Sequence, residues 1–380
     1  MNFEEKKRLQ SIYDAEITER LSNPSISRVY SESIRRKHPD LTLHNFGSVE
    51  LLSYLQAEFK NKKSIEIMDF GCGAGCDLAL YCRELQPNKA VGVEISRKML
   101  EQAQTLKEPI QWFNGDHFEL HKLDQTFDCI TSNAVIHLMQ NKLAVLNSLI
   151  KKLKKQGVLI SAEFVTNKSL PDTFLDHYNE SDGLFLFGGL IDSQSYLDLH
   201  FEAKFEEVEI LKKIKFDPRP QIKNLLLKFR PKNFELMIEQ LTQIEFEILV
   251  TRSQKELESE QVAFQCVNCG ELQAATKKFY RSLNCQVHKN LIKYMHESQW
   301  IKCKDCNVEQ FVAPFQVHDM QQNKMAFCFP SSMETNKQRL QYSILDPFKQ
   351  RLPHYSMVLC FRPIELITFL SSPQSKIHQK

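Results

Sequence analysis

The sequence predicts an α/β domain built on a mostly parallel sheet. Between residues 64 and 165, short apolar runs alternate with amphipathic stretches, which is typical of strands joined by helices. The first apolar run ends in a turn with a glycine at every second position, as in sheets that bind a ligand where their strands end. The chain has 380 residues and exceeds one such domain, so we expect further segments around it.

The elements follow one another in a regular order. Apolar runs predict strands at 65–70, 90–95, 110–113, 127–131 and 158–165, and amphipathic stretches predict helices at 78–85, 98–106 and 143–153. Pro87 and Asn88 follow the first helix, and Ser96 is suited to cap the second. Residues 205–214 alternate like an edge strand, whereas residues 221–257 predict one or two amphipathic helices.

These patterns divide the chain into four segments. Residues 1–62 form a helical lead-in, 63–216 the α/β domain, 217–260 a helical connector and 261–380 a basic, cysteine-rich module. From Gln261 onward the chain has 15 Lys and Arg and 8 Asp and Glu, a formal net charge of +7. The total of +2 then leaves a net charge of −5 for residues 1–260. The basic module predicts contact with a nucleic acid or a protein partner, while a solvated basic face is the alternative.

Composition indicates an ordinary globular protein inside the cell. The charged start MNFEEKKRLQ lacks the apolar core of a signal peptide, and no apolar run approaches the ~18 residues of a membrane span. We therefore expect a cytoplasmic protein with no membrane contact. In a reducing compartment the 11 cysteines are expected to be thiols or metal ligands.

The glycine turn lies within IMDFGCGAGCD, which contains Asp69, Gly71, Gly73 and Gly75. A phosphate-binding P-loop is excluded because no Gly-Lys-Ser/Thr follows, and the spacing differs from the Gly-x-Gly-x-x-Gly of nicotinamide-binding proteins. An acid at the strand end suits a cofactor with an ammonium and a sulfonium better than a pyrophosphate. The charge therefore points to S-adenosylmethionine (SAM).

Three later strand ends fit the same cofactor. Glu94 lies 19 residues after Gly75, where it can accept hydrogen bonds from both ribose hydroxyls. The next turn contains Asp116, His117 and Phe118: Asp116 is predicted to accept from the adenine amine, and Phe118 to sandwich the ring with Ile95. Asn133 ends the fourth strand, beside the methionine part.

At these positions the chain resembles the class I SAM-dependent methyltransferase superfamily, over residues 64–214. The matching motifs are DFGCGAG, VGVEIS, NGDHF, FDCITSNAVIHL and the strand that starts at Gly157. The resemblance implies a Rossmann-like, seven-stranded sheet with a helical insertion, and carries cofactor contacts to Asp69, Gly71, Gly73, Gly75, Glu94, Asp116 and Asn133. It implies methyl transfer to an unidentified small molecule, RNA or protein. The alternative is a non-catalytic scaffold whose tail binds nucleic acid or a protein.

The acceptor is less well defined. The stretch Ser-Asn-Ala-Val lacks the Asn/Asp-Pro-Pro-Tyr of amino-group methylation and the Pro-Cys of cytosine C5 chemistry. His137 is a candidate general base or simply a packed histidine. SNAVIHL, Lys142 and Gly188-Gly189 also resemble arsenite methyltransferases, yet Phe187 and Leu78 replace two of that family's cysteines, although Cys76 is near.

Two C-x-x-C pairs mark the C-terminal module. Cys266 and Cys269 precede a glycine, and Cys303 and Cys306 precede an asparagine, as in knuckles whose backbone amides face thiolates. This pattern predicts a tetrahedral, structural Zn²⁺. Cys285, His288 and His296 lie in the insert and leave open a second site or another ligand set. Reduced thiols without metal are the alternative.

Overall fold

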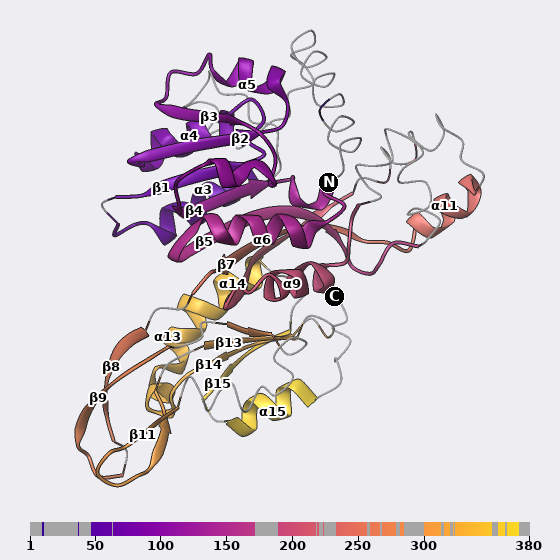
Figure 1. The fold of residues 1–380 in the computed structure, drawn as a ribbon. Helices are drawn as coiled ribbons and strands as arrows, with labels where there is room; N and C mark the ends of the chain where they lie inside the picture. The colour runs from indigo at the N-terminus through magenta and orange to yellow at the C-terminus, as the bar shows by residue number, and fades with distance from the viewer. Residues whose placement is uncertain are drawn as a thin grey trace. The chain divides into compact units, whose positions relative to one another are not determined.

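The computed structural model describes residues 10, 37, 47–62, 64–171, 189–217, 219, 223, 233–256, 259–266, 268–278, 282–284, 300–312, 315–319, 322, 324–351, 356–361 and 363–371. The chain divides into two compact units (Figure 1). The first comprises residues 1–205 and 210–255, and the second residues 206–209 and 256–380.

The first unit is built on a seven-stranded sheet with the order β3-β2-β1-β4-β5-β7-β6. β1 to β5 are all parallel, and β7 runs antiparallel to β5. The strands are β1 (Glu66–Phe70), β2 (Lys89–Glu94), β3 (Ile110–Asn114), β4 (Phe127–Asn133), β5 (Leu153–Thr166), β6 (Glu207–Phe216) and β7 (Phe246–Gln254). The predicted fold class is therefore confirmed, including an edge strand at β6.

Helices cover both faces of this sheet (Figure 1). The helices are α3 (Ser48–Glu58), α4 (Cys76–Leu85), α5 (Arg97–Ala103), α6 (Lys142–Lys152), α9 (Ser193–Glu202) and α11 (Phe234–Leu241). Leucines of α3 and α4 share one buried cluster with Ile67, Ile160 and Val250 of the sheet. On the other face, Tyr196 of α9 hydrogen-bonds Ser161 of β5 (3.0 Å). Ser96 caps α5, as predicted, by accepting from the Met99 amide (3.2 Å).

The helical prediction for residues 217–260 is wrong over β7. All nine residues of β7 are buried, and the strand lies between β5 and β6. A strand covered on both faces carries no apolar-polar alternation, so its sequence pattern did not separate it from a helix. Arg252 of β7 reaches α3, where it pairs with Glu58 (2.8 Å). α11 does form within the predicted helical segment. Of the predicted helical lead-in, residues 1–62, the structure describes residues 10, 37 and 47–62, which include α3.

The described residues of the second unit form three small sheets. β8 (Ser259–Gln265) pairs antiparallel with β9 (Leu272–Lys278), and β11 (Trp300–Lys302) with β12 (Glu309–Phe311). The third sheet has the order β10-β13-β14-β15, formed by Ser282–Asn284, Phe315–Asp319, Lys324–Cys328 and Ser356–Cys360. The described helices of the second unit are a 3-10 helix at Ser331–Asn336, α13 (Lys337–Leu340), a π-helix at Gln341–Leu345, α14 (Asp346–Arg351) and α15 (Pro363–Ser371).

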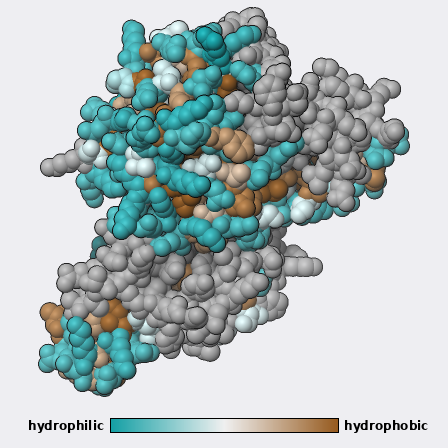
Figure 2. Space-filling view, in the orientation of Figure 1, coloured by the Kyte–Doolittle hydropathy of each residue, from teal (hydrophilic) through white to brown (hydrophobic). Residues whose placement is uncertain are grey.

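The visible described surface of the first unit is largely hydrophilic (Figure 2). Large exposed apolar side chains among the described residues are Phe118, Leu236, Leu272 and Tyr342. Of the described helices, none is both long enough and apolar enough to cross a membrane.

Candidate functional site

The glycine turn, residues 71–75, connects the end of β1 to the start of α4. Gly71, Gly73 and Gly75 all have positive φ, at 75°, 53° and 79°. A Cβ on Gly71 would lie 2.4 Å from a methyl of Val135, so only glycine fits there. A Cβ on Gly73 would meet no protein atom within 4 Å. Gly73 therefore leaves open space above the backbone, which is what a ligand cradle requires.

Glu94 ties the strand ends around this turn together. Its carboxylate accepts from the backbone amides of Gly73 (2.9 Å) and Ser96 (2.8 Å). The Asn114 side chain at the end of β3 donates to the carbonyls of Glu94 and Ile95, both at 3.0 Å. The structure thus brings together the predicted residues of β1, β2 and β3, although their contacts with a cofactor stay predictions.

Three carboxylates, Asp69, Asp77 and Glu94, form the acidic group of the site. Asp69 is buried and accepts from the Thr131 hydroxyl (2.7 Å). Burial, and then the charges of Asp77 and Glu94, raise the pKa of Asp69 to about 7, against the lowering effect of Thr131. A positively charged ligand would relieve this repulsion, so the acidic group favours a cation.

Asp77 links the acidic group to the predicted residue Asn133. The Asn133 amide donates to Asp77 (2.9 Å), and so does the Ser48 hydroxyl of α3 (2.8 Å). Burial raises the pKa of Asp77, while Asn133 and Ser48 partly oppose this. The Asn133 side chain thus holds an acidic residue of the site in place, and its contact with the cofactor's methionine part stays a prediction. Nothing in the sequence around Ser48 signalled this contact.

The predicted adenine residues follow β3 in one turn. Asp116 accepts from the Phe118 amide (2.8 Å), which fixes the turn. The rings of His117 and Phe118 lie 4.1 Å apart at 35°. His117 is buried, Ile95 is half-buried and Phe118 is 50% exposed. An exposed phenylalanine beside a buried acid is suited to stack on a flat polar ring.

His137 contacts a residue that the sequence analysis missed. Its Nδ1 lies 2.8 Å from Oε2 of Glu163, and both side chains are buried. Glu163 lies in β5 within an otherwise mostly apolar stretch, and a lone acid in a buried strand was the signal that could have identified it. His137 is thus part of a buried polar pair rather than an isolated packed histidine.

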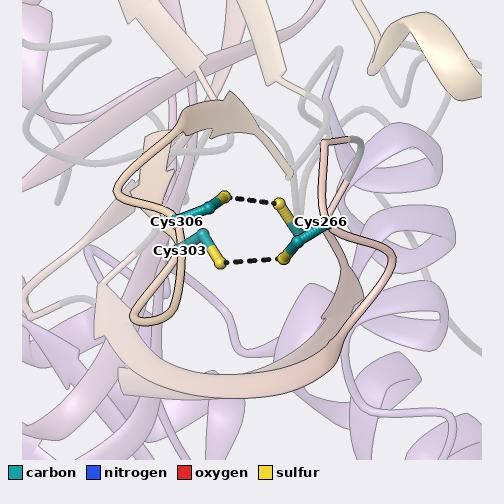
Figure 3. A group of neighbouring side chains, drawn as sticks. Cys266, Cys303 and Cys306 are labelled. Carbon is teal, nitrogen blue, oxygen red and sulfur yellow. Dashed lines mark hydrogen bonds between the residues drawn. The ribbon is translucent and has the colours of Figure 1, made fainter.

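The four-cysteine cluster in the second unit consists of Cys266, Cys269, Cys303 and Cys306. Their sulfur atoms all lie within 4.8 Å of one another. Figure 3 shows Cys303 and Cys306 facing Cys266 from another loop, with Cys266 and Cys306 sulfurs 3.5 Å apart. Zn–S bonds of ~2.3 Å in a tetrahedron place sulfurs about 3.8 Å apart, so these thiols fit Zn²⁺. Within the described chain this is the one such group of His, Cys, Asp or Glu. The other candidate ligands, Cys285, His288 and His296, lie outside the described residues.

The two knuckles have matching backbone geometry. Gly270 and Asn307, which follow the pairs, both have positive φ. Their amides donate to the carbonyls of Cys266 (2.9 Å) and Cys303 (3.0 Å). Amides of Cys269 and Asn268 lower the pKa of Cys266. The Asn268 side chain, with the Val308 amide, lowers the pKa of Cys306 to about 6.

Comparison with known proteins identifies the first unit. Residues 61–209 match the sequence profile of a family described as a methyltransferase domain. Together with the order of the seven strands, this match makes the domain a member of the class I SAM-dependent methyltransferase superfamily, as the sequence motifs predicted.

The similar curated proteins match only parts of the chain. An uncharacterized protein of Haemophilus influenzae is 34% identical over 111 residues, which cover 27% of this chain and 43% of that protein. A malonyl-[acyl-carrier protein] O-methyltransferase of Bacillus cereus is 28% identical over 115 residues, covering 30% and 43%. An arsenite methyltransferase of Halobacterium salinarum is 26% identical over 154 residues, covering 39% of each. The matched part of the chain thus spans less than half the length of each of these relatives.

Proposed function

We propose that this chain is a SAM-dependent methyltransferase. The observation that carries the proposal is the acidic group of Asp69, Asp77 and Glu94 around an open glycine turn, because burial of three carboxylates favours a cationic ligand. SAM, when bound, supplies a methyl group activated by a positively charged sulfur. The residues of the chain then bind and orient this cofactor and the acceptor, and exclude water.

The surroundings of four predicted cofactor residues support a role for each of them. Glu94 is placed at the end of β2 to accept from two ribose hydroxyls while it holds the Gly73 amide. Phe118 offers an exposed ring to the adenine, and Asp116, next to it, an acceptor for the adenine amine. Asp69, which is buried near the end of β1, supplies negative charge for the positive end of the cofactor.

The acceptor is tested by label transfer. Methyl-labelled SAM is incubated with the full chain and with separate RNA, protein and metabolite pools. We expect label in one pool with the wild type and its loss with Glu94→Gln. The matched control is Asp124→Asn, which removes an exposed acid of the same unit away from the glycine turn. Label that persists with Glu94→Gln, or that appears in no pool, would contradict the proposal.

Arsenite is a weaker candidate acceptor. Thiolates bind trivalent arsenic in the family that the sequence resembles, but the described residues gather no cluster of thiols at the glycine turn. Burial, followed by the charges of Glu94 and Asp69, raises the pKa of the Cys72 thiol well above its ordinary value. This shift disfavours the thiolate form of Cys72, the form that would bind arsenic.

We also propose that the four-cysteine cluster binds one structural Zn²⁺. Four thiolates in a tetrahedral set fill all positions of the metal, so such a site stabilises a fold and does not activate a substrate. The support is the convergence of four sulfurs from two hairpins, β8-β9 and β11-β12, on one point.

The zinc proposal is tested by elemental analysis of the purified full chain. We expect about one zinc per chain, and loss of it in the Cys266→Ser/Cys303→Ser double variant. Cys82→Ser is the matched control, because Cys82 is a half-buried thiol of α4 outside the cluster. A folded wild type without metal would contradict the proposal, as would equal zinc in the double variant.

A further inference from the structure

Glu163 is fully buried, and four hydrogen-bonding groups contact its carboxylate. The carboxylate accepts from the Ser132 hydroxyl (2.8 Å), the Val135 amide (3.0 Å) and the His137 amide (3.2 Å), and its Oε2 lies 2.8 Å from Nδ1 of the His137 ring. These groups belong to residues 132–137, at the end of β4 and just after it, and β4 pairs with β1, which leads into the glycine turn. Two backbone amides and a hydroxyl donate to this one side chain, so Glu163 is held in one orientation with its oxygens as acceptors.

This arrangement fixes the proton on the imidazole. A carboxylate only accepts hydrogen bonds, so Nδ1 of His137 carries the hydrogen and Nε2 presents a lone pair. Phe164 packs edge-on against the ring, with centroids 4.9 Å apart at 88°, which restricts its rotation. Burial, which outweighs the opposing effect of Glu163, lowers the pKa of His137. The histidine is therefore neutral near neutral pH, in the state in which it accepts a proton.

We propose that Glu163 is a positioning residue that makes Nε2 of His137 the general base, and that the acceptor is a hydroxyl or amine. This inference rests on the proposed methyl transfer. The acceptor oxygen or nitrogen bonds the methyl carbon with its lone pair, the carbon–sulfur bond breaks with its electrons left on sulfur, and the acceptor proton passes to Nε2. The products are the methylated acceptor, the demethylated cofactor with a neutral sulfur, and a protonated His137.

The His137–Glu163 pair favours acceptors that must lose a proton before or during methyl transfer. A hydroxyl or a protonated amine is a poor nucleophile until it loses a proton, and a positioned base contributes about 10²–10⁴-fold to such a reaction. A carboxylate is already ionised at neutral pH and gains nothing from His137. An arsenic centre attacks through its own lone pair and gains equally little.

The first test needs no acceptor. Long-range ¹H–¹⁵N NMR of the histidine-labelled full chain, with His137→Gln to identify the signal, reports which ring nitrogen is protonated. We expect Nδ1-H and a bare Nε2 in the wild type, and a larger Nε2-H population in Glu163→Gln. Ser161→Ala, which removes another buried hydrogen-bonding group of β5, should leave the His137 signal unchanged. A wild-type ring protonated at Nε2 would overturn the inference.

The second test measures methyl transfer from labelled SAM to four probes: 4-methylcatechol, phenethylamine, hexanoate and arsenite. We expect label on the catechol or the amine, reduced about 100-fold or more in His137→Gln and Glu163→Gln, with Ser161→Ala within about twofold of wild type. Label only on hexanoate or arsenite, no label on either base-requiring probe, or a full rate in Glu163→Gln would overturn the inference. Titration of the same samples with SAM distinguishes failure of this inference from failure of the proposed function. A wild type that does not bind SAM would contradict the proposed function itself.

Discussion

At the scale of single residues, Asp69 is the group whose protonation the site changes most clearly. In the cofactor-free protein burial and its acidic neighbours raise its pKa to about 7, from 3.8 for an ordinary Asp. The folded state thus binds a proton more tightly than the unfolded state does. Asp69 therefore lowers the free energy of unfolding progressively between about pH 4 and pH 7, and by a constant amount above that.

The same titration predicts a pH dependence of SAM binding. Only ionised Asp69 attracts the cation, so the SAM affinity should rise from about pH 5.5 to about pH 7.5, by up to about tenfold per unit below the pKa. The SAM amino group stays mostly charged over this range. Titration calorimetry at several pH values should show this rise in the wild type and a weaker, nearly flat affinity in Asp69→Asn. An equally steep rise in Asp69→Asn would contradict the role given to Asp69.

The sequence predicted those site residues whose role is local. Asp69, the three glycines and Glu94 lie at strand ends, where a short motif specifies backbone and charge together. Ser48 and Glu163 could not be predicted in the same way, because their roles depend on partners 29 and 26 residues away. The hydrogen bond from Asn133 to Asp77 was likewise not predicted, because the two residues lie 56 positions apart in the sequence.

At the scale of elements, the glycine turn offers a matched pair of substitutions. Gly71→Ala should lower the free energy of unfolding by about 1–3 kcal/mol from its positive φ alone, with a further cost from the 2.4 Å approach to Val135. Gly73→Ala has a similar φ penalty but no clash with protein atoms. It should fold and lose at least about tenfold in SAM affinity, because its methyl occupies the cradle.

Chemical denaturation and calorimetry distinguish the two outcomes. Gly71→Ala is expected to change stability most, and Gly73→Ala to change affinity with the smaller loss of stability. Unchanged SAM affinity in a folded Gly73→Ala protein would show that the cofactor does not approach the turn.

The elements themselves were predictable to different degrees. β1 to β5 and α4 to α6 were predicted from alternating runs, because each has a regular pattern and a clear boundary. β7 was missed because its nine residues are buried on both faces, with Arg252 and Ser253 satisfied by Glu58 and His200 from opposite sides. Such partners are set by tertiary structure and leave no trace in the local sequence.

Gln273 of β9 connects the two cysteine knuckles. Its side-chain nitrogen lies 3.1 Å from the Cys303 sulfur, and its oxygen accepts from the Lys304 amide (3.0 Å). Hydrogen bonds around a metal ligand typically contribute 10–100-fold to affinity. We expect Gln273→Leu to weaken zinc binding about tenfold or more in competition with a chromogenic chelator. Gln310→Leu is the control, because the Gln310 side chain donates to the Gln265 carbonyl (3.0 Å); equal affinities in both variants would contradict this role.

At the scale of the whole molecule, two compact units carry different chemistry. The first holds the acidic group, the glycine turn and the His137–Glu163 pair on the strand ends of one sheet. The second holds four thiols on two hairpins. The sequence separated these regions through its cysteines and charge, but assigned β7 to a connector, whereas the strand completes the first unit's sheet.

The central claim is that the first unit binds SAM through its acidic strand ends, and isothermal titration of the full chain with SAM tests it most directly. We predict one SAM per chain, an affinity lower by about tenfold to hundredfold in Glu94→Gln because hydrogen bonds to a charged group are lost, and no change in Asp124→Asn. NADH should give no heat. A folded wild type that gives no heat with SAM, or a Glu94→Gln variant that binds SAM as tightly as the wild type does, would contradict the account.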